Sequence, residues 1–139
     1  DKTETKNYKL YLQIFRNDML NIIAIFVGGG FGSLMRFGIS KVTTGNFQNI
    51  NPLATLLSNI ISTLILGLLL YFIGEKLLQN NVLKSFLLIG FCGGFSTFST
   101  FSFETFELIK NGNYWFAFFN IFLSLFVAIG ILFLLLRKM

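Results

Sequence analysis

The third apolar stretch of the chain holds an unusual run of hydroxyl and aromatic side chains. It begins at the pair Gly93–Gly94 and intersperses Phe with Ser and Thr as far as Glu104. Paired glycines before Ser and Thr favour a helix that breaks at the pair, and such a break persists at membrane depth only where protein or water satisfies the freed backbone. Because carbonyl groups exposed at a break can hold a cation, this stretch predicts a broken helix whose backbone is able to bind an ion.

Two aromatic residues in this run, Phe98 and Phe101, lie three positions apart and therefore share a helical face. The edge of an aromatic ring carries partial positive charge, so it can favour a small anion without the deep trap that a Lys or Arg would form. The chain contains 19 Phe residues, and packing in the core or against lipid is the ordinary explanation for any single one. Glu104 follows as a carboxylate well inside the apolar stretch.

A stripe of polar residues marks the second apolar stretch, at positions i, i+3, i+4 and i+7: Thr55, Ser58, Asn59 and Ser62. These positions share one face of a helix, and the Asn59 amide brings two hydrogen-bond donors. A stripe of neutral donors with no carboxylate opposite suits the lining of an anion pore. Hydrogen bonding between helices would give the same pattern, so both explanations stay open.

The first and fourth apolar stretches add fewer polar groups. Gly28 and Gly32 have the spacing that lets two helices approach closely. Arg36, two turns after Gly28, can extend to the membrane interface or give an anion vestibule a positive potential. Asn120 and Ser124, at i and i+4, either extend the donor stripe or tie helices together.

The composition indicates where these residues lie. The hydrophobic fraction is 54% and the charged fraction 12%, against about 25% charged in an ordinary soluble domain. Four apolar runs, at about residues 20–39, 53–73, 82–109 and 114–136, approach or exceed the roughly 20 residues needed to cross a bilayer. The sequence therefore predicts an all-α membrane protein with four transmembrane helices, the third of them broken in mid-membrane.

Residues 1–18 are predicted to differ from the four-helix domain of residues 19–139. In this tail Tyr8, Tyr11 and Phe15 recur at helical spacing among basic residues, a pattern typical of a short amphipathic helix lying on the membrane. The formal net charge is +5, and basic residues at helix ends indicate interfacial anchoring rather than a nucleic-acid partner. Without the tail the charge bias between the two sides is slight, which permits insertion in both directions.

Three segments resemble the Fluc (CrcB) family of fluoride channels: residues 28–36, which are rich in glycine and end in Arg36, the segment around Asn59, and residues 90–104. The last segment is the most specific by length and composition. The resemblance covers the four apolar runs from about Met19 onward and leaves out the tail. It implies a passive, fluoride-selective channel in the cell inner membrane or plasma membrane, which exports cytoplasmic fluoride and so relieves fluoride toxicity.

The resemblance also implies an architecture and a role for individual residues. The family forms an antiparallel, dual-topology homodimer with two separate pores and a structural sodium ion at the dimer centre. The backbone carbonyls of Gly93 and Ser96 would hold the sodium here. From the residues themselves, Arg36 and Glu104 are the candidate charges near the pore or its vestibule. The pore residues that the resemblance implies are Asn59, Phe98, Thr100, Phe101 and Ser124. The polar stripe of the second span adds Ser62 as a pore candidate, at a position where the family usually has Gly.

Two other functions remain open from the residues alone. A small proton-coupled exporter would need a titrating acid inside the membrane, for which Glu104 is the candidate. A membrane scaffold or subunit that transports nothing would need these residues only for packing between helices. An enzyme is the least expected, because the chain has no His and a single cysteine, Cys92, which leaves no catalytic triad, zinc site or redox pair.

Overall fold

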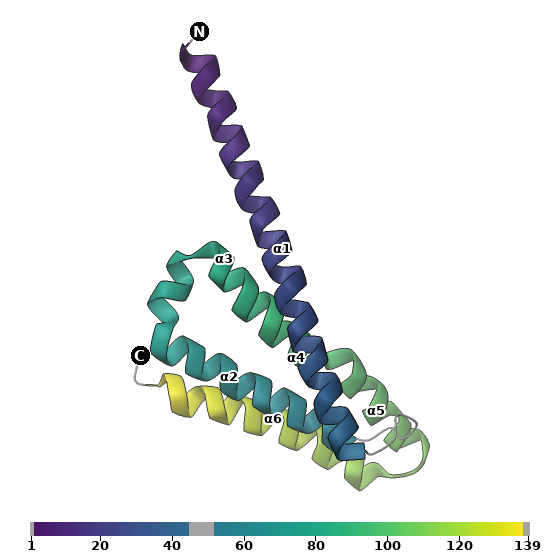
Figure 1. Cartoon of the computed structure of the whole chain (residues 1–139). Coiled ribbons are helices and arrows are strands. Elements are labelled where there is room, and N and C mark those ends of the chain that lie inside the picture. The colour runs from purple at the N-terminus through teal and green to yellow at the C-terminus, as the bar shows by residue number, and fades with distance from the viewer. Residues whose placement is uncertain (1, 45–51, 138–139) are drawn as a thin grey trace.

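The computed structural model describes residues 2–44 and 52–137, and every regular element within them is a helix (Figure 1). The expected loop over residues 45–51 and the chain ends at residues 1, 138 and 139 lie outside these ranges. Four helical segments are long and apolar enough to cross a membrane: Glu4–Thr43, Pro52–Gln79, Asn81–Lys110 and Tyr114–Leu136. The prediction of an all-helical chain with four membrane-length helices is therefore confirmed.

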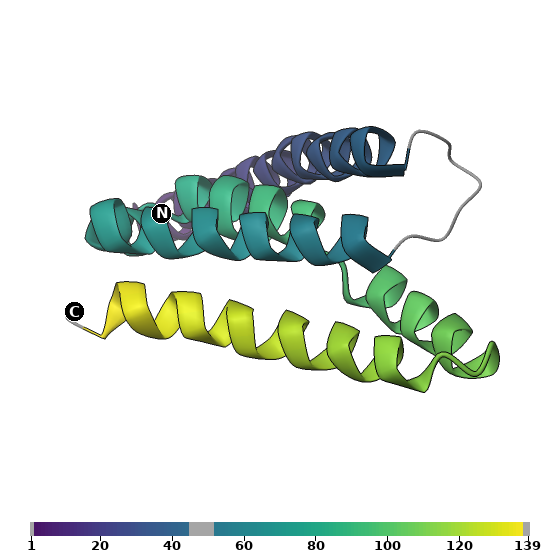
Figure 2. The same ribbon diagram turned by 90° about the horizontal axis from the view of Figure 1, so that it is seen from below.

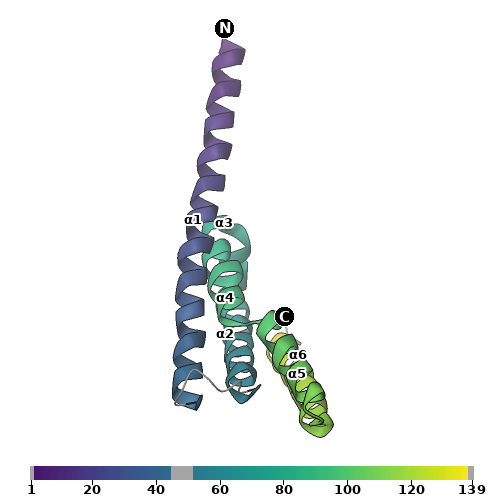
Figure 3. The same ribbon diagram turned by 90° about the vertical axis from the view of Figure 1, so that its right-hand side faces the viewer.

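Helix α1 (Lys2–Thr44) is a single helix of 43 residues that contains both the predicted tail and the first apolar run. At 1.5 Å per residue it is about 64 Å long, roughly twice the thickness of a bilayer core. The sequence has neither Gly nor Pro before Gly28, so no residue that commonly ends a helix separates the tail from the span. In place of a separate short helix, residues 2–18 are the N-terminal part of α1, which projects past the other helices (Figures 1 and 3).

Helices α2 (Pro52–Gln79) and α6 (Tyr114–Leu136) lie side by side (Figures 1 and 2). Pro52 suits the first turn of α2, because its missing N–H would have no helical partner there. The helix continues past the predicted end at residue 73, with a kink where Ile73 is non-helical (φ −133°, ψ 17°). A Cβ added at Gly67 would lie 2.6 Å from Leu135 Cδ1, so α2 and α6 approach closely at that point.

The third apolar run is built from consecutive pieces: α3 (Asn81–Lys84), the π-helix η1 (Ser85–Cys92), α4 (Gly93–Phe95) and α5 (Phe98–Lys110). Asn80 caps α3, since its Oδ1 accepts a hydrogen bond of 3.0 Å from the N–H of Leu83. π-Helical turns are rare and occur frequently at functional sites. A turn with Gly112 at φ +76°, a conformation that glycine adopts readily, leads from α5 towards α6.

Helix α1 packs against η1 and α4 at very short range because glycines lie at the contact. A Cβ added at Gly94 would lie 2.5 Å from the carbonyl oxygen of Gly29. A Cβ at Gly28 would collide with the carbonyl oxygen of Phe86, and Gly32 has equally little space against the backbone of η1 and α4. The spacing of Gly28 and Gly32 therefore marks a true helix contact, in which backbones meet without intervening side chains.

Little of the chain is buried within itself. Phe26 and Trp115 are 82% and 76% exposed, and large apolar side chains cover most of the outer surface. In water such a surface would be unfavourable by about 25 cal/mol for each Å², so lipid or another subunit must cover it. Among the residues that the structure describes, the buried polar or charged side chains are Thr55, Ser58, Ser62, Ser85, Thr97, Glu104, Thr105, Asn120 and Ser124.

Candidate functional site

The third span leaves helical geometry at Ser96 and Thr97. Both residues are extended, with φ −76° and ψ 157° at Ser96 and φ −150° and ψ 118° at Thr97. The sequence-based prediction placed the interruption at Gly93–Gly94, and that position is wrong, because Gly93 is helical (φ −66°, ψ −35°). Gly94 instead allows α1 to approach, and the chain leaves the helix two residues later.

A side chain from α2 stabilises this interruption. The Asn59 Oδ1 accepts a hydrogen bond of 2.8 Å from the backbone N–H of Thr97, and the Asn59 Nδ2 lies 3.4 Å from the Thr97 carbonyl oxygen, to which it donates. In a continuous helix the Thr97 N–H would donate to the carbonyl of Gly93. Asn59 therefore replaces one helical hydrogen bond, and its amide is held against the extended segment.

Thr97 is also the N-cap of α5. Its Oγ1 accepts a hydrogen bond of 3.3 Å from the N–H of Thr100 and donates one of 3.1 Å to the Thr100 Oγ1. A hydroxyl at this position commonly satisfies the first free N–H groups of a helix. The N–H of Thr100 would otherwise donate to the carbonyl of Ser96, so this capping redirects a second helical hydrogen bond.

The two redirected hydrogen bonds concern the carbonyls of Gly93 and Ser96. Each has its usual helical donor engaged elsewhere, by Asn59 in one case and by Thr97 in the other. Carbonyl oxygens freed in this way are hard ligands of the kind that bind alkali cations at interrupted helices. The backbone carbonyl oxygens of residues 93 and 96 are therefore chemically suited to a sodium ion. Within the residues described, no group of three or more His, Cys, Asp or Glu side chains could hold a metal ion.

Ser62 is buried and already has a partner. Its Oγ donates a hydrogen bond of 2.8 Å to the carbonyl oxygen of Cys92, the last residue of η1. This contact joins α2 to η1 one turn before the interruption. Since a hydroxyl has a single proton to donate, Ser62 in this arrangement has none left for a bound anion.

Phe98 and Phe101 stand together at the start of α5. Their ring centroids are 5.8 Å apart and their planes are inclined by 38°. Phe101 is 9% exposed, whereas Phe98 is 78% exposed. One ring is therefore fixed by packing, and the other lies on a surface that lipid or a second subunit must cover.

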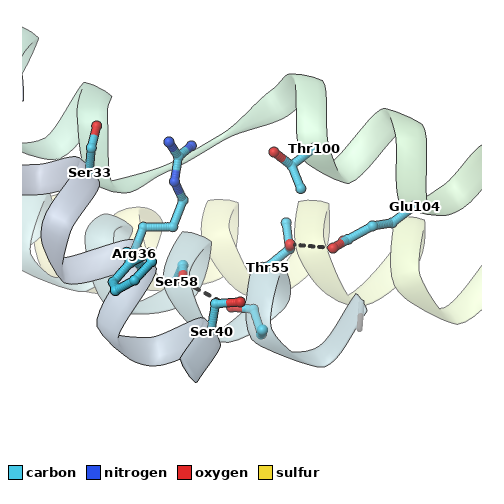
Figure 4. A pocket seen from close by; sticks show the side chains of 9 residues that line it. Ser33, Arg36, Ser40, Thr55, Ser58, Thr100 and Glu104 are labelled. Atoms are coloured by element: carbon cyan, nitrogen blue, oxygen red, sulfur yellow. Dashed lines mark hydrogen bonds between the residues drawn. The ribbon is translucent and has the colours of Figure 1, made fainter. Parts of the chain in front are cut away.

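A polar cavity of about 320 Å³ lies between α1, α2 and α5 (Figure 4). Arg36 extends into it from α1 and Glu104 from α5, so the two charged residues predicted near the pore line one space. Thr100 lines it as well. The remaining lining residues are Ser33, Phe37, Ser40, Ala54, Thr55 and Ser58.

The carboxyl group of Glu104 is held by α2. Thr55 Oγ1 donates a hydrogen bond of 2.8 Å to Glu104 Oε1 (Figure 4), and the residue is only 5% exposed. The second oxygen, Oε2, is buried without a hydrogen-bond partner among the described residues. The group is thus oriented by one hydroxyl and has one acceptor that no donor of this chain satisfies.

Asn120 and Ser124, on α6, lie outside the cavity that contains Arg36 and Glu104. Asn120 Nδ2 donates a hydrogen bond of 2.9 Å to Thr105 Oγ1. This bond joins α6 to α5, so Asn120 links two helices, which is one of the two roles considered for it from the sequence. Ser124 is 9% exposed, and its hydroxyl is buried without a partner in the part of the chain that the structure describes. It therefore has a free donor facing the interior.

The structure brings Asn59, Thr100 and the interruption together, and it places Arg36 and Glu104 on one cavity. The sequence reasoning gave no separate role to Thr97, which links Asn59 to the start of α5. The sequence does contain a pattern that could have predicted this role. Thr97 lies between the glycine pair and the following helix, three residues before Thr100, and a Thr at that spacing is typical of an N-cap.

Comparison with known proteins matches nearly the whole four-helix region. The sequence model of the CrcB-like protein family, described as Camphor Resistance (CrcB), matches residues 23–136. A protein of Coxiella burnetii (strain CbuK_Q154), named fluoride-specific ion channel FluC, is 43% identical over 112 residues, which are 80% of this chain and 90% of that protein.

Two further relatives bear the same name. The protein of Pyrococcus abyssi is 43% identical over 114 residues, covering 81% of this chain and 89% of that protein. The protein of Gloeothece citriformis is 40% identical over 116 residues, covering 84% of this chain and 94% of that protein. These relatives are named as ion channels, which is a non-enzymatic function, so the expectation that the chain is not an enzyme is confirmed. With its four membrane-length helices, the chain is a multi-pass membrane protein that belongs to the CrcB-like, or FluC, family.

Proposed function

We propose that this protein is a passive, fluoride-selective channel that lets fluoride leave the cytoplasm and so relieves fluoride toxicity. The observation that carries the proposal is the close similarity, over most of their length, to relatives named fluoride-specific ion channels. The site adds chemical support, because neutral donors gather around the interruption between α4 and α5. The cell inner membrane or plasma membrane is the expected location.

The proposed path runs along Asn59, Phe98, Phe101, Thr100 and Ser124, with Ser62 as a supporting residue at its edge. Fluoride is small and strongly hydrated, so replacement donors must compensate for the water that it loses. Amide, hydroxyl and ring-edge groups can do so without binding the ion too tightly to leave. The free hydroxyl of Ser124 and the amide of Asn59 are the donors best placed for this role.

Arg36 and Glu104 would act at the entrance. A cavity that contains an arginine raises the local concentration of anions. Glu104 lies in the same cavity, held by Thr55. We propose that this carboxyl group limits how strongly the arginine retains an anion, so that the vestibule attracts fluoride without trapping it.

The proposed assembly is an antiparallel homodimer with two pores. A single chain of four helices provides limited wall for a pore, and the 78% exposed ring of Phe98 needs a cover. A second copy in the opposite orientation would add to the pore wall and cover the Phe98 ring. In this arrangement the interruption at Ser96 and Thr97 would lie in mid-membrane, where a neighbouring subunit can satisfy the freed backbone.

A structural sodium ion would join the two copies. The carbonyls of Gly93 and Ser96 would hold it, and their usual helical donors are engaged elsewhere. When bound, sodium supplies a fixed positive charge that compensates converging carbonyl dipoles. This chain's own contribution is to keep those carbonyls free, through Asn59 and the Thr97 cap.

Fluoride release from liposomes that contain the purified protein tests the proposal. A fluoride electrode should record rapid release, while matched vesicles loaded with chloride should lose little. If folded and inserted protein released no fluoride, the proposed function would be wrong, and a coupled substrate or a missing subunit would have to be sought.

A further inference from the structure

The N-terminal part of α1 lies beyond the helical bundle. A cavity of about 280 Å³ at the end of the bundle is lined mostly by side-chain amides, from Asn17, Asn21, Gln79, Asn80 and Asn81. Amides need partners and are unfavourable in hydrocarbon, so this ring of polar groups marks where the membrane-embedded part ends. Residues 2–16 precede it and continue outward as helix (Figure 3).

This outer segment, which we call the α1 extension, has a wide apolar arc. Tyr8, Tyr11, Leu12 and Phe15 recur at spacings of three and four, and Leu10 and Ile14 widen the arc on one side. All six side chains are between 49% and 72% exposed. Since every residue from 4 to 20 is exposed, the rest of the chain covers none of this surface.

The opposite side of the α1 extension is basic. Lys6, Lys9 and Arg16 occupy one narrow stripe with Gln13 between them, again at spacings of three and four. Other basic residues lie at helix ends on this side of the bundle, since Lys76 is near the end of α2, Lys84 ends α3 and Arg137 follows α6. These three residues add positive charge at the end of the bundle from which α1 projects, where the acidic residues Asp18 and Glu75 also lie.

We propose that the α1 extension binds an anionic lipid surface at this end of the protein. By bending near Asn17 and Asp18 it would lie along the membrane, with its apolar arc among the headgroups and its basic stripe attracted by lipid phosphates and carboxylates. A basic face opposite an apolar, aromatic-rich face is the pattern of helices that bind anionic membranes. The bend would break helical hydrogen bonds that water can replace, and the exposed side chains of the arc and the stripe have little packing to lose.

Charge favours lipid over a second copy of the chain as the occupant. A second copy packed on the apolar arc would leave both basic stripes facing outward without a partner, whereas an anionic surface would engage the arc and the stripe together. The segment is also short, since about 15 residues of isolated helix are marginal in water. This inference concerns residues outside the matched family region and does not depend on fluoride conduction.

Tryptophan fluorescence of the full-length protein tests the proposal. The Trp115→Phe variant removes the chain's single tryptophan and serves as background for Tyr11→Trp on the apolar arc and Gln13→Trp on the basic side. In vesicles that contain anionic lipid, we expect the indole introduced at position 11 to emit at shorter wavelength and to be quenched by brominated acyl chains. The indole introduced at position 13 should remain accessible to acrylamide in the water.

The role of charge is tested with Lys6→Glu/Lys9→Glu/Arg16→Glu in the Tyr11→Trp background, with Lys41→Glu at the far end of α1 as control. Each basic residue near an anionic surface contributes about fivefold to partitioning, so the triple variant should lose the quenching by brominated lipid and the control should keep it. High salt should weaken the quenching in the parent protein, because it screens the surface charge.

Two results would overturn the proposal. Equal accessibility of position 11 to acrylamide in neutral and anionic vesicles would show that the segment projects into water. Equal shielding in both kinds of vesicle, rising with the ratio of protein to lipid, would show that a second copy covers it. Neither result would change the expected fluoride release. The proposal for the α1 extension and the proposal for fluoride conduction are therefore tested separately.

Discussion

The side-chain oxygen of Asn59 on α2 accepts a hydrogen bond of 2.8 Å from the backbone N–H of Thr97, the residue that precedes α5. The Asn59 amide thus stabilises the interruption of the third span. Its nitrogen donates back to the Thr97 carbonyl over a longer distance of 3.4 Å, so this donor is the weaker half of the pair. Asn59 is therefore suited both to fix the backbone and to present a donor to an anion.

Replacing this amide by a carboxylate should separate its two roles. Asn59→Asp keeps an acceptor for the Thr97 N–H but puts a negative charge where the account needs a donor. We expect the fold to persist and fluoride release to fall by about tenfold or more, since like charges at short range repel strongly in a medium of low dielectric constant. Liposome efflux and gel filtration together measure both effects. The same substitution at exposed Asn81, on α3, serves as control, and parent-like flux in Asn59→Asp would remove Asn59 from the proposed path.

The two phenylalanines should respond differently to the same change. Phe101→Ile should lower both fluoride flux and thermal stability, because the ring is buried and its contacts would be lost. Phe98→Ile should lower flux with a smaller loss of thermal stability than Phe101→Ile, because within the chain the Phe98 ring is 78% exposed. Phe103→Ile, on the same helix and 55% exposed, is the control for general effects of ring removal. Flux that is normal in both Phe98→Ile and Phe101→Ile would contradict the role of the ring edges.

The contact between Thr55 and Glu104 should matter for stability. Thr55→Val keeps the shape but removes the hydroxyl that donates to Glu104 Oε1 at 2.8 Å, leaving a buried carboxyl oxygen unpaired. Such a loss costs about 1–3 kcal/mol, visible as a lower midpoint of thermal unfolding. Thr63→Val is the matched control on α2, because the Thr63 hydroxyl donates only to the Asn59 carbonyl within the same helix. Equal stability of the two variants would show that the Thr55 hydrogen bond contributes nothing.

The close packing of α1 predicts a contrast between two glycines of one helix. Gly32→Ala would place a Cβ 2.7 Å from the backbone nitrogen of Phe95, so α1 and α4 would have to separate. Gly38→Ala meets no atom within 4 Å in the part of the chain that the structure describes, and alanine favours the helix by about 0.5–1 kcal/mol. Thermal unfolding should show Gly32→Ala destabilised and Gly38→Ala unchanged or stabilised. The reverse order would mean that α1 packs through another face.

The main helices could be predicted from the sequence because lipid imposes a simple rule on each span, about 20 apolar residues. The position of the interruption could not, since glycine permits both a break and a close helix contact. Gly94 serves the contact, and the break falls where Asn59, distant in sequence, takes the N–H of Thr97. Local patterns do not reveal a partner that lies 38 residues away.

The candidate site was predictable as a set of residue types but not as a geometry. The spacing of Thr55, Ser58, Asn59 and Ser62 placed them on one face, and the structure shows that each has a different partner. Whether Ser62 donates to Cys92 or to an ion depends on how η1 sits against α2, which the spacing of residues does not determine.

The most direct test of the central claim is the zero-current voltage of the reconstituted protein in a planar bilayer, with different fluoride and chloride concentrations on the two sides. A passive fluoride channel predicts a voltage that follows the fluoride gradient and does not change when chloride or pH is varied on one side. A voltage that follows chloride would contradict fluoride selectivity, and transport that requires a proton gradient would contradict the passive mechanism and favour a coupled exporter that uses Glu104.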